Sequence, residues 1–173
     1  QNQLVNDFLE TDCTHLFLTE MDMILPKHTI PALVELGKPI ASGLYFLRGG
    51  NGQPCVYAKS ATPADNPYPH APVSLLPLSR PFGRVGLCPG LGCVLIVRQV
   101  FEQLKFPWFD LKESTYGSDM YFYTHVTRAG IEVWVHPGVA CDQIDYQVVG
   151  IEDYRRRLKE DPKFAGSGFI LGE

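Results

Sequence analysis

The chain has 173 residues, of which 45% are hydrophobic and 20% are charged, and its formal net charge is −4. This length and balance indicate one domain with a sizeable core, and the acidic balance argues against a nucleic-acid binder that works through a basic surface. No apolar run approaches the roughly 20 residues of a membrane-spanning helix. No charged segment followed by an apolar one opens the chain, so no signal peptide is expected.

The cysteines are odd in number, scattered, and without a CxxC pair; they are Cys13, Cys55, Cys88, Cys93 and Cys141. Neither a zinc site nor a disulfide framework is therefore expected. Small buried thiols in a reducing cytoplasm are the interpretation that fits this pattern.

The first half of the chain alternates between helix and strand patterns. Leu4, Val5 and Phe8 recur at helical spacing, which predicts a helix near the start. The expected elements are a helix over 2–11, a buried strand over 14–19, a helix over 26–37, a strand over 38–46, a turn over 48–54 and a strand over 55–60. The last two strands and their turn predict a hairpin.

The second half begins with a proline-rich segment, 61–82, that predicts an ordered loop or a mobile lid and no regular element. Two strand-like runs within 83–97, helices over 98–104, 118–130 and 151–161, a loop over 105–117, and strands over 131–137 and 139–146 are then expected. This alternation predicts an α/β sheet. We expect a core domain over 1–150, followed by a C-terminal helix and tail over 151–173.

Glu20 and Asp22 follow the buried strand directly, in the run LFLTEMD. Ligands bind at the carboxyl ends of strands in open α/β sheets. On an extended chain, side chains two residues apart face the same way, and two such carboxylates repel each other unless a cation lies between them. Mg²⁺ and Mn²⁺ prefer such oxygen ligands. The alternative is that Glu20 closes a turn and Asp22 is merely solvated.

Asp119 is expected in the first turn of the helix over 118–130, with Ser118 as its N-cap. The positive end of the helix dipole favours the ionised carboxyl, as a general base requires. Plain capping by both residues is the alternative.

Two further segments are candidates for contact with a ligand. Gly90 and Gly92, in PGLG, permit a tight turn and close approach of a ligand, or simply join two strands. Trp108 lies in the loop sequence PWFD and is either a core plug or a platform for a sugar ring.

In this order the segments LFLTEMD, GKPIASGLYF, GLGCVLIVRQVFEQLKFPWFD, GSDMYFYTHVTRAGIEVWVHP and CDQID resemble the GT-A fold nucleotide-sugar glycosyltransferases of the inverting family-two type, especially compact bacterial and phage-like members. The resemblance covers about residues 2–146. It implies a GT-A-like, Rossmann-like mixed sheet flanked by helices, N-terminally truncated because the family's first strand–helix unit has no counterpart.

The resemblance also implies roles for particular residues. Glu20 and Asp22 match the family's Asp-x-Asp metal motif, with Glu in place of the first Asp. Asp119 matches the catalytic base, and Gln143 stands where many members have a metal-binding His. The residues expected to contact substrate are Gly90, Leu91, Gly92, Trp108 and Ser118, where Ser118 replaces the Glu of a Glu-Asp pair.

The expected function is transfer of a sugar, by single displacement, from a nucleotide-diphosphate donor to an acceptor hydroxyl. The expected partners are a UDP-sugar, a carbohydrate or other hydroxyl acceptor, and Mn²⁺ or Mg²⁺ as cofactor, with the protein in the cytoplasm. A degenerate, non-catalytic binding domain is the alternative. A sugar nucleotidyltransferase is a third possibility, but the chain shows no glycine-rich basic phosphate loop near its start.

Overall fold

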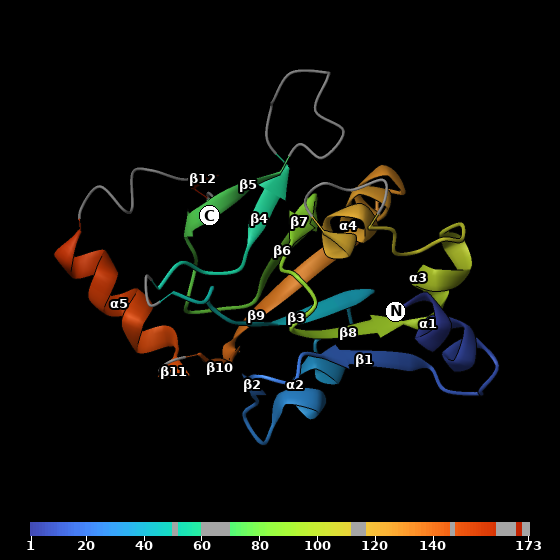
Figure 1. Cartoon of the computed structure of the whole chain (residues 1–173), viewed down its shortest axis with the longest axis horizontal. Helices are drawn as coiled ribbons and strands as arrows, with labels where there is room; N and C mark the ends of the chain where they lie inside the picture. The colour runs from blue at the N-terminus through green and yellow to red at the C-terminus, as the bar shows by residue number, and fades with distance from the viewer. Residues whose placement is uncertain (50–51, 60–69, 112–116, 146–147, 162–168, 171–173) are drawn as a thin grey trace.

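A mixed five-stranded sheet forms the centre of the protein (Figure 1). The computed structural model describes residues 1–49, 52–59, 70–111, 117–145, 148–161 and 169–170. The strand order is β1 (His15–Thr19), β8 (Cys93–Val97), β3 (Ile40–Leu44), β9 (Glu132–Ala140) and β6 (Phe82–Val85). β3 and β9 are parallel, and the other neighbours are antiparallel. The expected α/β sheet flanked by helices is therefore confirmed.

Both faces of this sheet are buried, because alternate residues of its inner strands are apolar on each side. In β8, Val94 and Ile96 join one cluster, and Cys93 and Leu95 join the other. The first cluster includes apolar residues of α1 (Asn2–Leu9), α3 (Arg98–Gln103) and α4 (Ser118–Arg128), and the second includes Leu33 of α2 (Thr29–Glu35). Figure 1 shows α2 and α4 on opposite sides of the sheet.

Two smaller sheets flank the central one. One has the order β11 (Val148–Val149), β10 (Asp142–Ile144) and β2 (Met23–Ile24). The other has the order β12 (Phe169–Ile170), β5 (His70–Leu75), β4 (Tyr57–Lys59) and β7 (Leu87–Cys88).

The second small sheet corrects two expectations. The predicted hairpin is present only as a short antiparallel closure: Phe46 bridges Pro54, the Leu47 amide donates to the Gln53 carbonyl over 2.8 Å, and the Cys55 amide donates to the Tyr45 carbonyl over 2.9 Å. The expected pairing does not continue, because β4 pairs with β5 and β7 and not with β3. β5 lies inside the proline-rich segment expected to lack regular structure; residues 61–69 of that segment lie outside the described residues. Pro72 is tolerated because its neighbour Val73 makes the bond to β4, with its amide donating to the Val56 carbonyl over 2.8 Å, so the amide that Pro72 lacks would point away from β4.

The predicted helices are present, with shorter bounds for α2. The amide and hydroxyl of Thr29 both donate to the carbonyl of Pro26, so residues 26–28 form a turn before the helix begins. Four cysteines are buried, as expected, whereas Cys13 is exposed.

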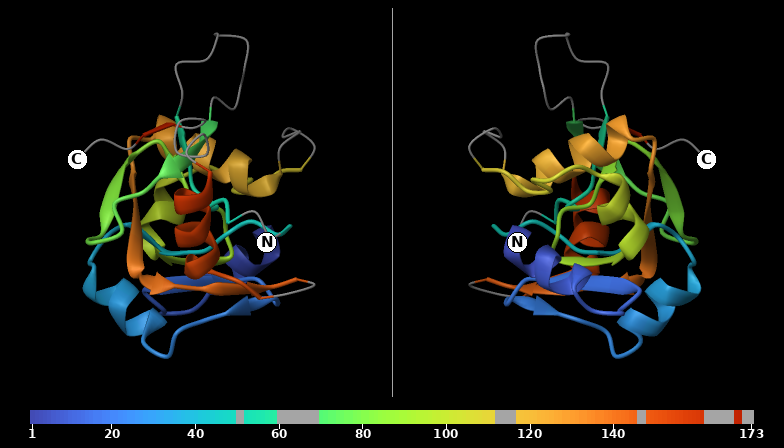
Figure 2. Two further views of the ribbon diagram at one scale, coloured as in Figure 1. Left: turned by 90° about the vertical axis from the view of Figure 1, so that its left-hand side faces the viewer. Right: turned by 90° about the vertical axis from the view of Figure 1, so that its right-hand side faces the viewer.

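The last helix, α5 (Ile151–Glu160), packs on the main core through Tyr154, which is fully buried with its ring 5.6 Å from that of Phe46. The left-hand view of Figure 2 shows α5 at the near end of the molecule. The domain boundary at residue 150 stays a prediction. None of the helices in the described ranges is long and apolar enough to cross a membrane.

Candidate functional site

The two acidic residues after β1 lie in a tight turn. β1 is held along its length by β8 and ends at Thr19, and the Met23 amide then donates to the Glu20 carbonyl over 3.3 Å. The expected extended arrangement of Glu20 and Asp22 is therefore wrong. Their carboxylates nevertheless stay close: partial burial, followed by the charge of Asp22, raises the pKa of Glu20.

Asp22 meets residues from two distant segments. Its Oδ2 atom accepts a hydrogen bond from Gln143 Nε2 over 3.0 Å and forms an ion pair with Arg48. Its Oδ1 atom is buried and has no hydrogen-bond partner among the described residues. Gln143 reaches Asp22 because β10 pairs with β2, with Gln143 opposite Met23. The structure thus brings together Asp22 and Gln143, which the sequence linked only through the resemblance.

Arg48 lines the site but was not indicated by the sequence. It stands in the glycine-rich turn after β3, where no periodic pattern singles it out. The neighbouring Gly49 amide donates to Asp145 Oδ2 over 3.0 Å, which holds the turn against the end of β10. A cavity of about 550 Å³ opens here, which we call the acid–arginine pocket; it is lined by Thr19, Glu20, Met21, Asp22, Arg48 and Ile144.

Asp119 belongs to the same electrostatic neighbourhood. Its charge contributes to the raised pKa of Glu20, after burial and Asp22. Burial raises the pKa of Asp119 itself, while a 2.8 Å hydrogen bond from the Met120 amide to Asp119 Oδ1 opposes that rise. Glu20, Asp22 and Asp119 therefore gather negative charge from two separate elements, with Arg48 as the cation beside them.

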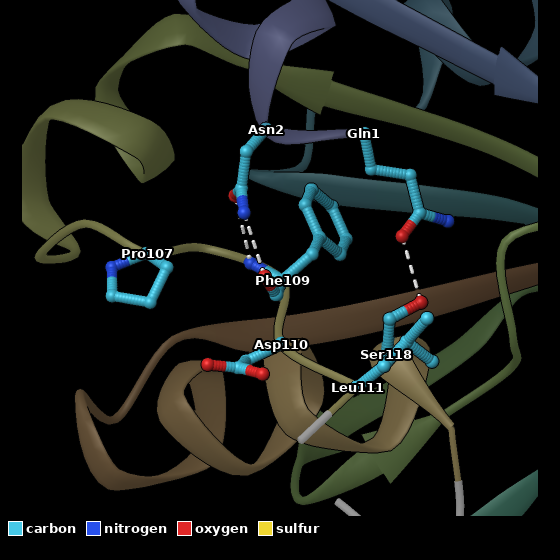
Figure 3. Close-up of a pocket in the computed structure, with 7 residues that line it drawn as sticks. All are labelled: Gln1, Asn2, Pro107, Phe109, Asp110, Leu111 and Ser118. Carbon is cyan, nitrogen blue, oxygen red and sulfur yellow. Dashed lines mark hydrogen bonds between the residues drawn. The ribbon is translucent and has the colours of Figure 1, made fainter. Parts of the chain in front are cut away.

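Ser118 does not cap α4, contrary to the sequence expectation. Gly117 is the N-cap, and Ser118 is the first helical residue. Its hydroxyl donates to Gln1 Oε1 over 2.7 Å, as the dashed line in Figure 3 shows. The side chain therefore faces a second pocket, of about 380 Å³, between α1 and the start of α4.

The turn of Gly90, Leu91 and Gly92 forms a buried floor under the acidic residues. The Gly92 carbonyl accepts hydrogen bonds from the Glu20 amide over 3.3 Å and from the Thr19 hydroxyl over 3.0 Å. A Cβ atom on Gly92 would lie 2.8 Å from Tyr45 Cζ. The close approach that these glycines permit is thus used by Tyr45, and their contact with substrate stays a prediction.

Two tyrosines fix this floor from different sides. The Gly92 amide donates to the Tyr45 hydroxyl oxygen over 3.1 Å, and the Tyr123 hydroxyl donates to the Gly90 carbonyl over 2.7 Å. Burial raises the pKa of both hydroxyls well above the usual value. Both groups therefore stay neutral and act as fixed dipoles beneath the carboxylates.

Two further neutral groups adjoin the floor. Burial, more than any charge, raises the pKa of the Cys55 thiol to about 12, and burial also raises the pKa of Tyr57 to about 12. The charge of Asp119 contributes to both shifts, which places the two side chains near that carboxyl. Neither residue carried a signal in the sequence.

Trp108 is a core residue. It is 7% exposed, its ring packs edge-on against Phe101, and its Nε1–H donates to the Phe101 carbonyl over 3.0 Å. The Asn2 side chain accepts from the amides of Trp108 and Phe109 and donates to the Phe109 carbonyl, so its contacts secure the loop to α1 (Figure 3). A role for Trp108 as a sugar platform stays a prediction, and its packing offers it no free face.

The carboxylates fit a divalent cation that arrives with a phosphate-bearing ligand. The described residues contain no group of three or more His, Cys, Asp or Glu suited to hold a metal. Mg²⁺, however, is commonly held by one or two carboxylates together with substrate phosphates. Glu20 and Asp22 supply two carboxylates, and Asp22 Oδ1 is a buried oxygen in need of a partner. Gln143 directs its nitrogen to Asp22, so ligation through its oxygen stays a prediction.

Comparison with known proteins corrects the family suggested by the sequence. No protein-family model matches the chain, and no curated protein matches it. Among solved structures, the crystal structure of A197 from STIV is similar, with a TM-score of 0.59 and 20% identity over 88% of this chain and 70% of that one. At this identity the likeness shows the fold alone. The assignment to the GT-A glycosyltransferases of the inverting family-two type is therefore wrong as a statement of family.

Proposed function

We propose that this chain binds a nucleotide-diphosphate sugar at the acid–arginine pocket and transfers the sugar to an acceptor hydroxyl. The observation that carries the proposal is that one buried glycine turn is bonded to both elements: the Gly92 carbonyl accepts from the Glu20 amide, and Tyr123 of α4, the helix whose first turn holds Asp119, donates to the Gly90 carbonyl. Asp119 is close enough to help raise the pKa of Glu20. The residues that line the pocket thus supply a cation platform, and Asp119, which is not among them, supplies a nearby carboxyl base.

The proposed mechanism is a single displacement at the anomeric carbon. Asp119 accepts the proton of the acceptor hydroxyl as the new glycosidic bond forms and the bond to the diphosphate breaks. Glu20 and Asp22 would hold a Mn²⁺ or Mg²⁺ ion, which supplies charge neutralisation for the leaving diphosphate. The neutral floor of Tyr45 and Tyr123 keeps the base of the site rigid and partly dry.

Calorimetry with UDP tests the donor half of this proposal. We expect UDP to bind in the presence of Mn²⁺ and to bind more weakly after Mn²⁺ is chelated. If the wild-type chain fails to bind millimolar UDP with Mn²⁺ present, the proposal is wrong.

A binding domain without catalysis is a second candidate. The observation that favours it is that Gln143, at the position where the resemblance implies a metal ligand, donates its Nε2 to Asp22 and so makes a contact within the fold. On this alternative UDP or a UDP-sugar binds without turnover. Release of UDP from a bound UDP-sugar, with water or added hydroxyl acceptors, distinguishes the two candidates.

A further inference from the structure

Arg48 and Asp22 form a contact between two independently held turns. Asp22 lies in the turn after β1, where the Ile144 amide donates to its carbonyl over 2.8 Å. Arg48 lies in the turn after β3, and its neighbour Gly49 is anchored to Asp145. Neither backbone depends on the ion pair for its position. The Arg48 side chain, 60% exposed, is therefore free to move while both turns stay in place.

A guanidinium at Asp22 conflicts with a metal ion at the same carboxylate. Like charges a few ångströms apart repel each other strongly when they are partly shielded from water. The side chain of Asp22 is only 21% exposed, so this shielding applies. A divalent cation that uses the buried Oδ1 atom would lie next to the guanidinium bound at Oδ2. Binding of Arg48 to Asp22 therefore opposes binding of the cation to Asp22, and the cation opposes binding of Arg48.

We propose that Arg48 and a divalent cation compete for Asp22, and that the displaced guanidinium binds the diphosphate of the donor. The first half depends only on the ion pair and the unpartnered oxygen. The second half rests on the proposed function. Arg48 lines the acid–arginine pocket, and the planar fork of a guanidinium matches phosphate oxygens geometrically.

This exchange makes binding of the metal and of the nucleotide cooperative. Arg48 weakens the binding of a metal ion that arrives alone, because the ion must displace it. A diphosphate gives the displaced guanidinium a new partner, so it lowers the cost of that displacement. By linkage, the metal strengthens nucleotide binding by the same factor.

The test compares Arg48→Gln with Arg156→Gln. Arg156 forms an ion pair with Asp153 on α5, and its side chain is 57% exposed, so it matches Arg48 in charge and exposure. Titration with Mn²⁺ alone, followed by electron paramagnetic resonance, measures the competition. We expect Arg48→Gln to bind Mn²⁺ about tenfold more tightly than the wild type, because a repelling charge is removed. Arg156→Gln should match the wild type.

Calorimetry with UDP at saturating Mn²⁺ measures the phosphate contact. We expect about tenfold weaker UDP binding by Arg48→Gln, because a charge-assisted contact is lost. Arg48→Lys keeps the charge without the fork, so it should still compete with Mn²⁺ and recover only part of the UDP affinity. Circular dichroism confirms that each variant is folded.

The outcomes separate this inference from the proposed function. Unchanged or weaker Mn²⁺ binding by Arg48→Gln overturns the competition. Unchanged UDP affinity in the same variant overturns the phosphate contact. Failure of the wild type to bind UDP at saturating Mn²⁺ overturns the proposed function and the phosphate contact together, while the titration with Mn²⁺ alone still decides the competition.

Discussion

Arg48–Asp22 and Arg156–Asp153 are ion pairs of the same chemistry in different parts of the molecule. Their side-chain exposures are nearly equal, at 60% and 21% for the first pair and 57% and 18% for the second. Asp153 divides its donors: Oδ1 accepts from Arg156, and Oδ2 accepts from the Gly150 amide at the start of α5. In Asp22, both donors act on Oδ2, and Oδ1 is buried without a partner among the described residues.

The difference teaches how to tell a carboxylate that stabilises the fold from one suited to a ligand. Asp153 uses both oxygens to close the N-terminus of α5, and the pairing is local in sequence. A buried carboxylate oxygen without a hydrogen bond raises the free energy of the native state. Asp22 carries this cost, and a bound cation would remove it. Exposure and charge alone do not distinguish the two aspartates; the use of each oxygen does.

The largest expected effect concerns turnover, and it contrasts Asp119, the proposed base at the start of α4, with Asp153 at the start of α5. Asp119→Asn should slow UDP release from a UDP-sugar by about 10²–10⁴-fold, because the amide cannot accept the acceptor proton. Asp153→Asn should leave the rate unchanged. Coupled detection of UDP measures both rates, and circular dichroism checks the fold. Turnover by Asp119→Asn at the wild-type rate would sink the assignment of the base.

The next effect concerns stability, and here the larger loss is expected on α5 and the smaller one at the acid–arginine pocket. Asp153→Asn should lower the free energy of unfolding by about 1 kcal/mol, because it weakens the closure of α5. Asp22→Asn should change it by less than about 0.5 kcal/mol, since Arg48 is 60% exposed and is hydrated once the ion pair is lost, and the buried carboxylate oxygen without a partner is removed. Urea unfolding of both variants measures the difference.

The same two variants also differ in ligand binding. Asp22→Asn should lose most of the Mn²⁺ dependence of UDP binding, whereas Asp153→Asn should keep it. Equal losses of stability in Asp22→Asn and Asp153→Asn would contradict the proposed difference between the two aspartates. An unchanged Mn²⁺ dependence of UDP binding in Asp22→Asn would contradict it as well.

The smallest effect is a pH dependence of stability at Asp119. Burial raises its pKa above the usual 3.8, so the folded state binds the proton more tightly than the unfolded chain does. The resulting stabilisation is complete below pH 3.8 and is lost as the pH rises through the raised pKa. Asp119→Asn carries no charge and avoids that loss. Its melting temperature should equal the wild-type value at low pH and exceed it at pH 7; a difference independent of pH would contradict the burial of an ionised Asp119.

The sequence predicted the elements whose apolar spacing is set by the core. α1 has helical periodicity, α4 begins with the helix-start residues Ser118 and Asp119, and β1 is a short apolar run, so local pattern and tertiary burial agree. β5 was missed because prolines signal a loop, whereas pairing with β4 and β12 overrides that local preference. The predicted hairpin pairs only at residues 45–47 and 53–55, because a glycine-rich turn does not determine which sheet the next strand joins.

The sequence predicted several residues of the site but not how they are arranged in space. Glu20, Asp22 and Asp119 were singled out because carboxylates at strand ends and helix starts are informative positions. Arg48, Tyr45 and Tyr57 were not, because their importance arises only when β3 and the turns around it meet β1 and α4. The glycine turn was predicted to make room for a ligand, and the structure shows that Tyr45 uses that room.

The two tyrosine hydroxyls that hold the floor have a consequence for the timing of events at this site. A floor fixed at Gly90 and Gly92 from both sides leaves little slow rearrangement to perform when a ligand enters. The movable part is the exposed Arg48 side chain at the rim, and exposed side chains change rotamer within picoseconds to nanoseconds. Ligand entry is then limited by diffusion and desolvation. The residence time of the ligand depends on the strength of the contacts that break when it dissociates.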